Sequence, residues 1–85
     1  MNKTLDKLKD HYIVCGYGKT GKKVVEELLA KKQKVVLIEG NAERNDKLKD
    51  FFDENLIHIV GDATSDEVLI QAGVQRAKFV ISVLS

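Results

Sequence analysis

The sequence predicts an α/β fold of three layers, αβα, with a parallel sheet between layers of helices. Two observations predict this fold. Short apolar runs alternate with helical patterns in the order βαβαβαβ along the 85 residues. The runs are apolar throughout, which is typical of parallel strands covered on both faces. Right-handed crossovers then give the strand order 3-2-1-4. The arrangement is Rossmann-like, equivalent to the first half of a doubly wound nucleotide-binding fold plus one strand, with the second half incomplete.

The first strand–helix unit begins with Tyr-Ile-Val-Cys at residues 12–15, a β-prone run that ends at Gly16. From residue 19 to about residue 31, apolar side chains recur at helical spacing with charged residues between them. Residues 33–39 contain Val-Val-Leu-Ile and predict a second buried strand. Together these segments predict the β-α-β unit on which a nucleotide site could form.

The second helix is expected to begin after Asn41, a favoured N-cap residue, and to reach about residue 52. Its predicted apolar face consists of Leu48, Phe51 and Phe52. This helix would pack that face against the sheet.

A third strand is predicted over residues 56–60, where Gly61 stops the apolar run. Thr64 and Glu67 have the spacing of a capping box, so a helix should start there and end at Gly73. Residues 78–84 predict a fourth buried strand. Its open edge would be apolar and uncharged, and we expect it to pair with a further segment or with another copy of the chain.

Composition excludes several classes of protein. The net charge is +1, so no broad electrostatic field favours nucleic acid. A single cysteine fits a reducing compartment, and no apolar run approaches the roughly 20 residues that a membrane span needs. A cytoplasmic domain is therefore expected.

The turn Gly16-Tyr17-Gly18-Lys19-Thr20-Gly21 follows the first strand directly and opens a helix. In this position Gly16 permits a tight turn, Gly18 allows a pyrophosphate to approach the backbone, and Gly21 allows the helix to lie close to the strand. The helix N-terminus would attract phosphates, and Lys19 would add a mobile cation. Packing alone is the alternative role for the glycines. A magnesium–nucleotide loop of the Walker type is excluded because Lys23 stands where serine or threonine is required.

Glu39 ends the second strand, 18 residues after Gly21. A carboxylate there can accept hydrogen bonds from ribose hydroxyls and would repel the 2′-phosphate of NADP. The expected ligand is therefore NAD(H) or an adenine nucleotide (ATP, ADP or AMP). Asn41 and, less strongly, Arg44 are placed to help hold the ribose or a phosphate, whereas a merely solvated glutamate is the alternative.

The sequence Gly61-Asp62-Ala63-Thr64 ends the third strand at the same edge of the predicted sheet. Asp62 could accept a hydrogen bond from an adenine amino group, and Ala63 could offer a small apolar surface. Thr64 is about equally well explained as a helix cap. Both roles are compatible.

The remaining polar candidates favour structural roles. His11 precedes the first strand at the end opposite the binding edge, and His58 lies inside the third strand. Cys15 is expected to be a small buried residue, and Tyr17 either covers the phosphates or lies on the surface. No catalytic group and no set of metal ligands is predicted.

Three segments resemble a known family: "DHYIVCGYGKTGKKVVEELL", "VVLIEGN" and "IVGDATSDEVLIQAGVQRAKFVISVLS". They resemble the RCK domain (regulator of K+ conductance, also called KTN or TrkA-N) over nearly the whole chain from Asp10 onward. The N-terminal "LDKLKDHYIVCGYG" resembles the junction between a potassium channel's last membrane helix and its cytosolic domain. The resemblance thus implies a linker segment at residues 1–10 and a truncated N-terminal nucleotide-binding domain at residues 11–85.

The resemblance implies a non-enzymatic regulatory domain that binds NAD(H), ATP, ADP or AMP. It would form a homodimer or a larger ring at the cytosolic face of the membrane. Ligand-dependent rearrangement of that assembly would control a potassium channel or K+ transporter subunit. The alternatives are a fragment of an NAD-dependent oxidoreductase and a dimerisation module with a vestigial site. The nucleotide-binding residues implied are Gly16, Tyr17, Gly18, Lys19, Thr20, Gly21, Glu39, Gly40, Asn41, Asp62, Ala63 and Thr64.

Overall fold

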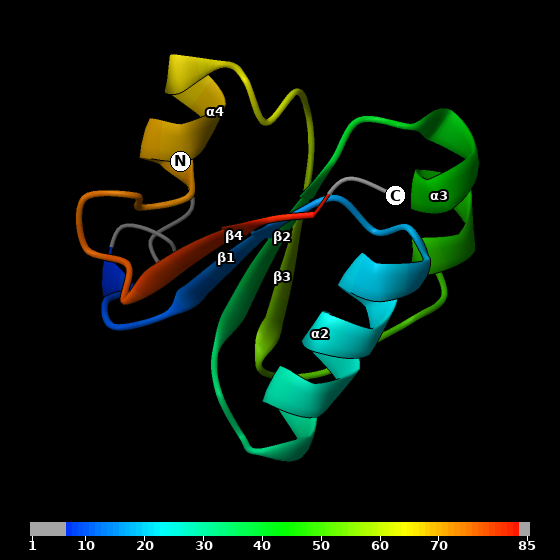
Figure 1. Cartoon of the computed structure of the whole chain (residues 1–85), viewed down its shortest axis with the longest axis horizontal. Helices are drawn as coiled ribbons and strands as arrows, with labels where there is room; N and C mark the ends of the chain where they lie inside the picture. The colour runs from blue at the N-terminus through cyan, green and yellow to red at the C-terminus, as the bar shows by residue number, and fades with distance from the viewer. Residues whose placement is uncertain (1–6, 84–85) are drawn as a thin grey trace.

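The structure is a computed structural model that describes residues 7–83. Its four strands form one parallel sheet in the order β3-β2-β1-β4, which confirms the predicted topology (Figure 1). The strands are β1 (Tyr12–Cys15), β2 (Val35–Glu39), β3 (Leu56–Val60) and β4 (Phe79–Ser82). The helices that connect them are α2 (Lys19–Ala30), α3 (Ala42–Leu48) and α4 (Asp66–Gln71).

The strand register brings the segments predicted to bind a ligand to one edge of the sheet. Cys15, the last residue of β1, pairs with Ile38 of β2 and with Ser82 of β4. Glu39 pairs with Val60, the last residue of β3. The loops that follow β1, β2 and β3 therefore start side by side.

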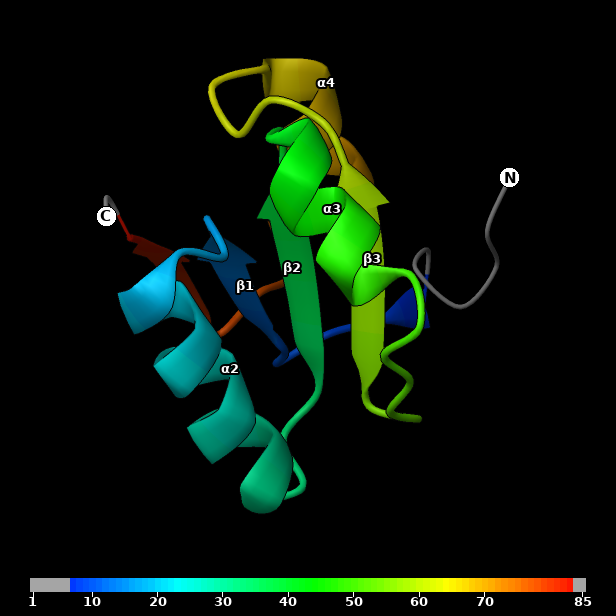
Figure 2. The ribbon, with the colours of Figure 1, turned by 90° about the vertical axis from the view of Figure 1, so that its right-hand side faces the viewer.

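Helices α2 and α3 cover one face of the sheet, and α4 lies against the other (Figure 2). Alternate residues of β1 and β2 point to opposite faces, and each set is buried under its own helices. The α2–α3 side buries Val14, Val25, Leu29, Val35, Leu37 and Leu48. The α4 side buries Ile13, Cys15, Val36, Ile38, Ile59 and Ala72. This arrangement confirms the three-layer fold.

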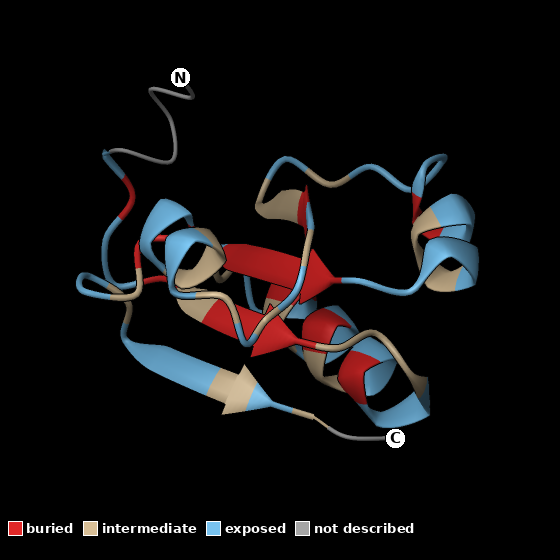
Figure 3. Cartoon of the chain, turned by 90° about the horizontal axis from the view of Figure 1, so that it is seen from above, coloured by how far each residue is buried: buried red, intermediate tan, exposed pale blue. Residues whose placement is uncertain are grey.

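The prediction of a buried fourth strand is wrong. Phe79 and Val80 of β4 are 55% and 46% exposed, and most of this strand is coloured as exposed in Figure 3. Neighbouring residues of a strand point to opposite faces of the sheet, so neither face of β4 is fully covered. Strand β4 lies at the edge of the sheet, beside β1 alone, so an apolar sequence there does not ensure burial. A stacked contact between the rings of Phe79 and Tyr12, with centroids 5.6 Å apart, covers part of this surface. The predicted end of the strand at Leu84 lies outside the described residues.

Helix α3 ends at Leu48, four residues earlier than predicted. Leu48 is buried as expected, but Phe51 is 44% exposed and Phe52 is 87% exposed. No glycine or proline marks the end of this helix in the sequence, so the apolar spacing extended it too far.

The N-terminal segment contacts the body of the domain through Leu8, whose side chain is buried with the α4-side core. The guanidinium Nε of Arg76 donates a 2.9 Å hydrogen bond to the Leu8 carbonyl. Residues 1–6 of the predicted linker lie outside the described residues. The amide of Asp10, at the end of the predicted linker, donates a 2.8 Å hydrogen bond to the Arg76 carbonyl, between α4 and β4.

Candidate functional site

A cleft of about 640 Å³ opens at the carboxyl ends of the strands. Its polar rim comes from three consecutive strand–helix loops, and its floor comes from apolar residues of β1, β2 and β4. Clefts at this edge of open α/β sheets are the usual ligand sites of such folds. Six predicted site residues line it: Gly16, Glu39, Gly40, Asp62, Ala63 and Thr64.

The glycine turn is shaped by two of its three glycines. Gly16 has φ of +106°, in the left-handed region, and a Cβ there would lie 2.5 Å from the Val83 carbonyl oxygen. A Cβ on Gly21 would collide with the carbonyl oxygen of Gly16. Gly18, in contrast, has φ −78° and ψ −165°, an extended conformation open to any residue. The fold thus explains Gly16 and Gly21, whereas Gly18 has no such backbone requirement.

Helix α2 begins at this turn without a side-chain cap, because its N-cap is Gly18. Its first turn contains no acidic residue. The first backbone hydrogen bond across the turn joins the amide of Lys22 to the Gly18 carbonyl at 2.9 Å. The amides before it have no partner within the helix, so the helix dipole and these amides favour an anion at this point.

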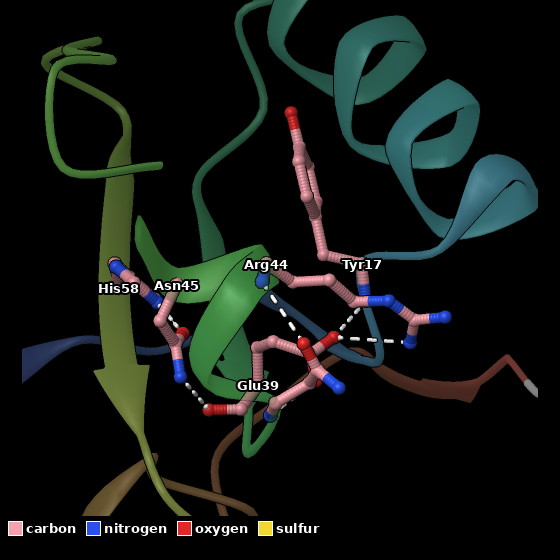
Figure 4. Close-up of polar contacts among 6 residues, drawn as sticks. Tyr17, Glu39, Arg44, Asn45 and His58 are labelled. Carbon is pink, nitrogen blue, oxygen red and sulfur yellow. Dashed lines mark hydrogen bonds and ion pairs between the residues drawn. The ribbon is translucent and has the colours of Figure 1, made fainter. Parts of the chain in front are cut away.

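Glu39 joins the first two loops of the cleft (Figure 4). Its side chain is only 6% exposed. One carboxylate oxygen accepts a hydrogen bond from the amide of Tyr17 at 2.5 Å, and the other accepts one from the amide of Asn41 at 2.8 Å. Arg44 lies 3.6 Å from the first oxygen. The carboxylate is therefore fixed between the glycine turn and the start of α3.

These contacts stabilise the ionised form of the Glu39 carboxyl group. Burial alone raises the pKa of the carboxyl group. The hydrogen bonds from the amides of Asn41 and Tyr17, the charge of Arg44 and a further amide at Gly40 outweigh burial, and the pKa lies below its usual value. Glu39 is accordingly an anion at neutral pH.

Asn45 of α3 supports this arrangement, although no sequence motif marks it as a site residue. Its amide nitrogen donates a 2.9 Å hydrogen bond to the Glu39 carbonyl. Its side-chain oxygen lies 2.6 Å from Nε2 of His58 (Figure 4). Burial lowers the pKa of His58, while the charge of Glu39 partly opposes this effect. The structural role predicted for His58 is thus to anchor α3 to β3.

The Asp62 carboxylate orders the third loop. It accepts hydrogen bonds from the amide and the hydroxyl of Thr64, at 2.8 and 2.7 Å, and these bonds lower its pKa. The cap predicted at Thr64 is wrong by one residue, because the hydroxyl of Ser65 accepts the bond from the amide of Val68. Both hydroxyl side chains are good caps, but the turn at Asp62 already uses Thr64.

The other predicted site residues lie outside the cleft. The side chain of Asn41 caps α3 by accepting a 3.0 Å bond from the amide of Arg44. Gly21 is buried beneath the turn, and Thr20 is exposed on α2. Tyr17, Gly18 and Lys19 line a second groove.

The second groove, of about 510 Å³, lies between α2 and α3. Arg44 lines both this groove and the cleft. The ring of Tyr17 packs partly on the α2–α3 core, and its burial and the charge of Glu26 raise its pKa. The lining residues are Tyr17, Gly18, Lys19, Lys22, Glu26, Arg44, Lys47 and Phe51.

Other polar candidates are structural. His11 is fully buried, and its Nε2 lies 2.8 Å from the carbonyl of Ala72 at the end of α4. Cys15 is buried, which raises the pKa of its thiol. Residues 7–83 contain no group of three or more histidine, cysteine or carboxylate side chains placed to hold a metal ion.

Comparison with known proteins identifies the family. The TrkA-N domain model matches residues 12–85, so the chain belongs to the TrkA-N domain family. A crystal structure of the TrkA-N domain of the inner membrane protein ybaL from Escherichia coli superposes with a TM-score of 0.78 at 28% identity. The match covers 92% of this chain and 56% of that one.

Relatives of the chain include proteins named as potassium channel and potassium uptake proteins. Potassium channel protein 1 of Methanocaldococcus jannaschii is 43% identical over 95% of this chain and 24% of its own length. The Trk system potassium uptake protein TrkA of Vibrio alginolyticus is 30% identical over 84% of this chain and 15% of its own. The chain thus spans a quarter or less of these relatives. No helix within the described part of the chain is long and apolar enough to cross a membrane.

Proposed function

We propose that residues 11–85 form a nucleotide-binding regulatory domain that controls a potassium channel or K+ transporter, with residues 1–10 as a linker. The ligand is NAD(H) or an adenine nucleotide. The observation that carries this proposal is the cleft at the carboxyl ends of the strands, where the glycine turn, Glu39 and the Asp62 loop meet. The conformation of Gly18 adds support, because the turn itself does not require a glycine there.

Each loop has a distinct role in the proposed complex. The phosphates lie against the amides at the start of α2, where Gly18 lets them approach the backbone. Glu39 accepts a hydrogen bond from a ribose hydroxyl. A carboxylate offers about four acceptor positions, of which the amides of Tyr17, Asn41 and Gly40 take three. The ribose hydroxyl would take the fourth, beside Arg44. Ala63 and the Asp62 loop border the adenine.

Control of transport follows from a difference in affinity between two arrangements of the assembled domains. A ligand shifts such an equilibrium only as far as it prefers one state. A preference of about 10- to 100-fold supplies roughly 1.4–2.7 kcal/mol per site. In a homodimer or ring at the cytosolic face of the membrane, these contributions add. The partner is the membrane pore or transporter subunit, and the domain catalyses no reaction.

Binding is tested by titration calorimetry of the purified chain with NADH, NAD, ATP, ADP and AMP. Mass spectrometry of the denatured protein identifies any nucleotide retained during purification. We expect at least one of these ligands to bind below millimolar concentration. Gly18→Val should abolish the binding heat because its side chain blocks the approach of the phosphates, whereas exposed Glu27→Ala on α2 is a control that should not change it. The absence of binding heat for every ligand at millimolar concentration would leave a dimerisation module with a vestigial site.

Regulation is tested separately, with light scattering of the chain with and without the ligand that binds. A change in the distribution between monomer and assembly is expected. An assembly unaffected by a saturating ligand would contradict the regulatory part of the proposal.

A further inference from the structure

The groove between α2 and α3 concentrates positive charge beside the nucleotide cleft. Lys19 and Lys22 come from α2, and Arg44 and Lys47 come from α3. Glu26 is the one acidic residue among those that line the groove. The whole chain carries a net charge of only +1, so this concentration of cations is local.

The cleft and the groove meet at the pair formed by Glu39 and Arg44. Glu39 lines the cleft, Arg44 lines both cavities, and the two side chains lie 3.6 Å apart. The backbone of Tyr17 bonds to Glu39 while its side chain lines the groove (Figure 4). A sugar bound against Glu39 would therefore carry one of its hydroxyl positions next to the mouth of the groove.

From this placement we infer that the groove binds a phosphate group carried on the ribose of the nucleotide, at its 2′ or 3′ position. The inference rests on the nucleotide site of the proposed function and extends its ligand class to adenine nucleotides that are also phosphorylated on the ribose. Glu39 takes the hydroxyl that remains free, and Arg44, Lys22 and Lys47 surround the phosphate. Arginine can contact a phosphate with two parallel hydrogen bonds, and each lysine adds a charge.

Sequence alone favours the opposite preference, since an acidic residue at the end of the second strand repels a ribose phosphate. In the structure the Glu39 carboxylate is already neutralised in part by two amides and Arg44. Three lysines line the same groove beyond it. The cations outnumber the carboxylates at this point, so the local field favours the added phosphate.

The test compares isomers of equal composition. Calorimetry measures the affinity of the chain for adenosine 2′,5′-bisphosphate, adenosine 3′,5′-bisphosphate and ADP, with AMP and inorganic phosphate as references. One of the ribose phosphates should bind at least tenfold more tightly than ADP, and its position identifies the hydroxyl that faces the groove. Inorganic phosphate alone should bind far more weakly.

Matched double variants assign the effect to the groove. Lys22→Gln with Lys47→Gln removes two charges that line it. Lys23→Gln with Lys49→Gln removes two exposed charges from neighbouring positions that do not line it. The first pair should reduce the preference over ADP to less than threefold, and the second pair should preserve it. Thermal unfolding of both pairs checks that the fold is retained.

Each other outcome overturns a defined part of the account. If ADP binds as tightly as both ribose bisphosphates, the groove does not hold a ribose phosphate, the inference is overturned and the proposed function stands. An equal loss of preference in both double variants would attribute it to overall charge and overturn the inference. If no adenosine ligand binds, the proposed function itself fails.

Discussion

Replacing Glu39 by alanine tests whether one buried carboxylate holds the two loops of the cleft together. The side chain is 6% exposed and accepts hydrogen bonds from the amides of Tyr17 and Asn41. Alanine leaves both amides without that partner. It also leaves Arg44 without the carboxylate that lies 3.6 Å from its guanidinium.

The expected loss of stability follows from these contacts. A partly buried donor left unsatisfied costs about 1–3 kcal/mol. Two donors, with some access of water to the open cleft, give a decrease of about 2–4 kcal/mol in the free energy of unfolding. For a domain of this size, each kcal/mol shifts the melting temperature by about 4–8 °C, so a fall of about 10–30 °C is expected.

Urea denaturation followed by circular dichroism measures this free energy, with unchanged m-values as the sign of an intact two-state transition. Glu27→Ala is the control, because Glu27 is exposed on α2 and alanine favours a helix. A loss below about 0.5 kcal/mol for Glu39→Ala, the range of ordinary surface substitutions, would refute the structural role assigned to this carboxylate. It would leave Glu39 free to act through ligand contact alone.

Three further predictions follow from local geometry. Gly21→Ala should lower the free energy of unfolding by at least about 2 kcal/mol because its Cβ would collide with the Gly16 carbonyl. Gly18→Ala should lower it by less than about 1 kcal/mol, and equal losses for the two variants in urea titrations would contradict this difference. Ser65→Ala should reduce stability by about 0.5–1 kcal/mol as the loss of a cap, and a larger loss for Thr64→Ala would restore the cap predicted from sequence. The folded state lowers the pKa of His58, so the stability that this residue contributes is present above its ordinary pKa of 6.5 and is lost as the pH falls through the lower folded value. His58→Gln should therefore reduce the dependence of the free energy of unfolding on pH in that window. An unchanged pH profile would show that His58 is not the source of that dependence.

The strand order could be predicted because its determinants are local and repeated. Each strand is a short apolar run, each connection is long enough for a helix, and parallel crossovers have one hand. The six predicted residues that line the cleft follow from the same topology, since loops after parallel strands open at one edge. Predicting the strand order and these cleft residues requires only that each strand and helix exists, and does not require the residues at which it begins and ends.

The structure differs from the sequence-based predictions where a feature depends on contacts between distant parts of the fold. Exposure of Phe79 depends on what lies beside an edge strand, and composition does not specify that neighbour. Ser65 caps α4 in place of the predicted Thr64 because the Thr64 hydroxyl donates its hydrogen bond to Asp62. The groove between α2 and α3 requires the relative placement of two helices, which periodicity within either helix does not encode.

A titration of ¹⁵N-labelled protein with an adenine nucleotide, followed by amide NMR spectra, tests the central claim most directly. We expect saturable shifts concentrated in residues 16–21, 39–41 and 61–64, with small changes at the opposite end of the sheet. Saturable shifts confined to another surface, or unchanged spectra at millimolar nucleotide, would contradict it.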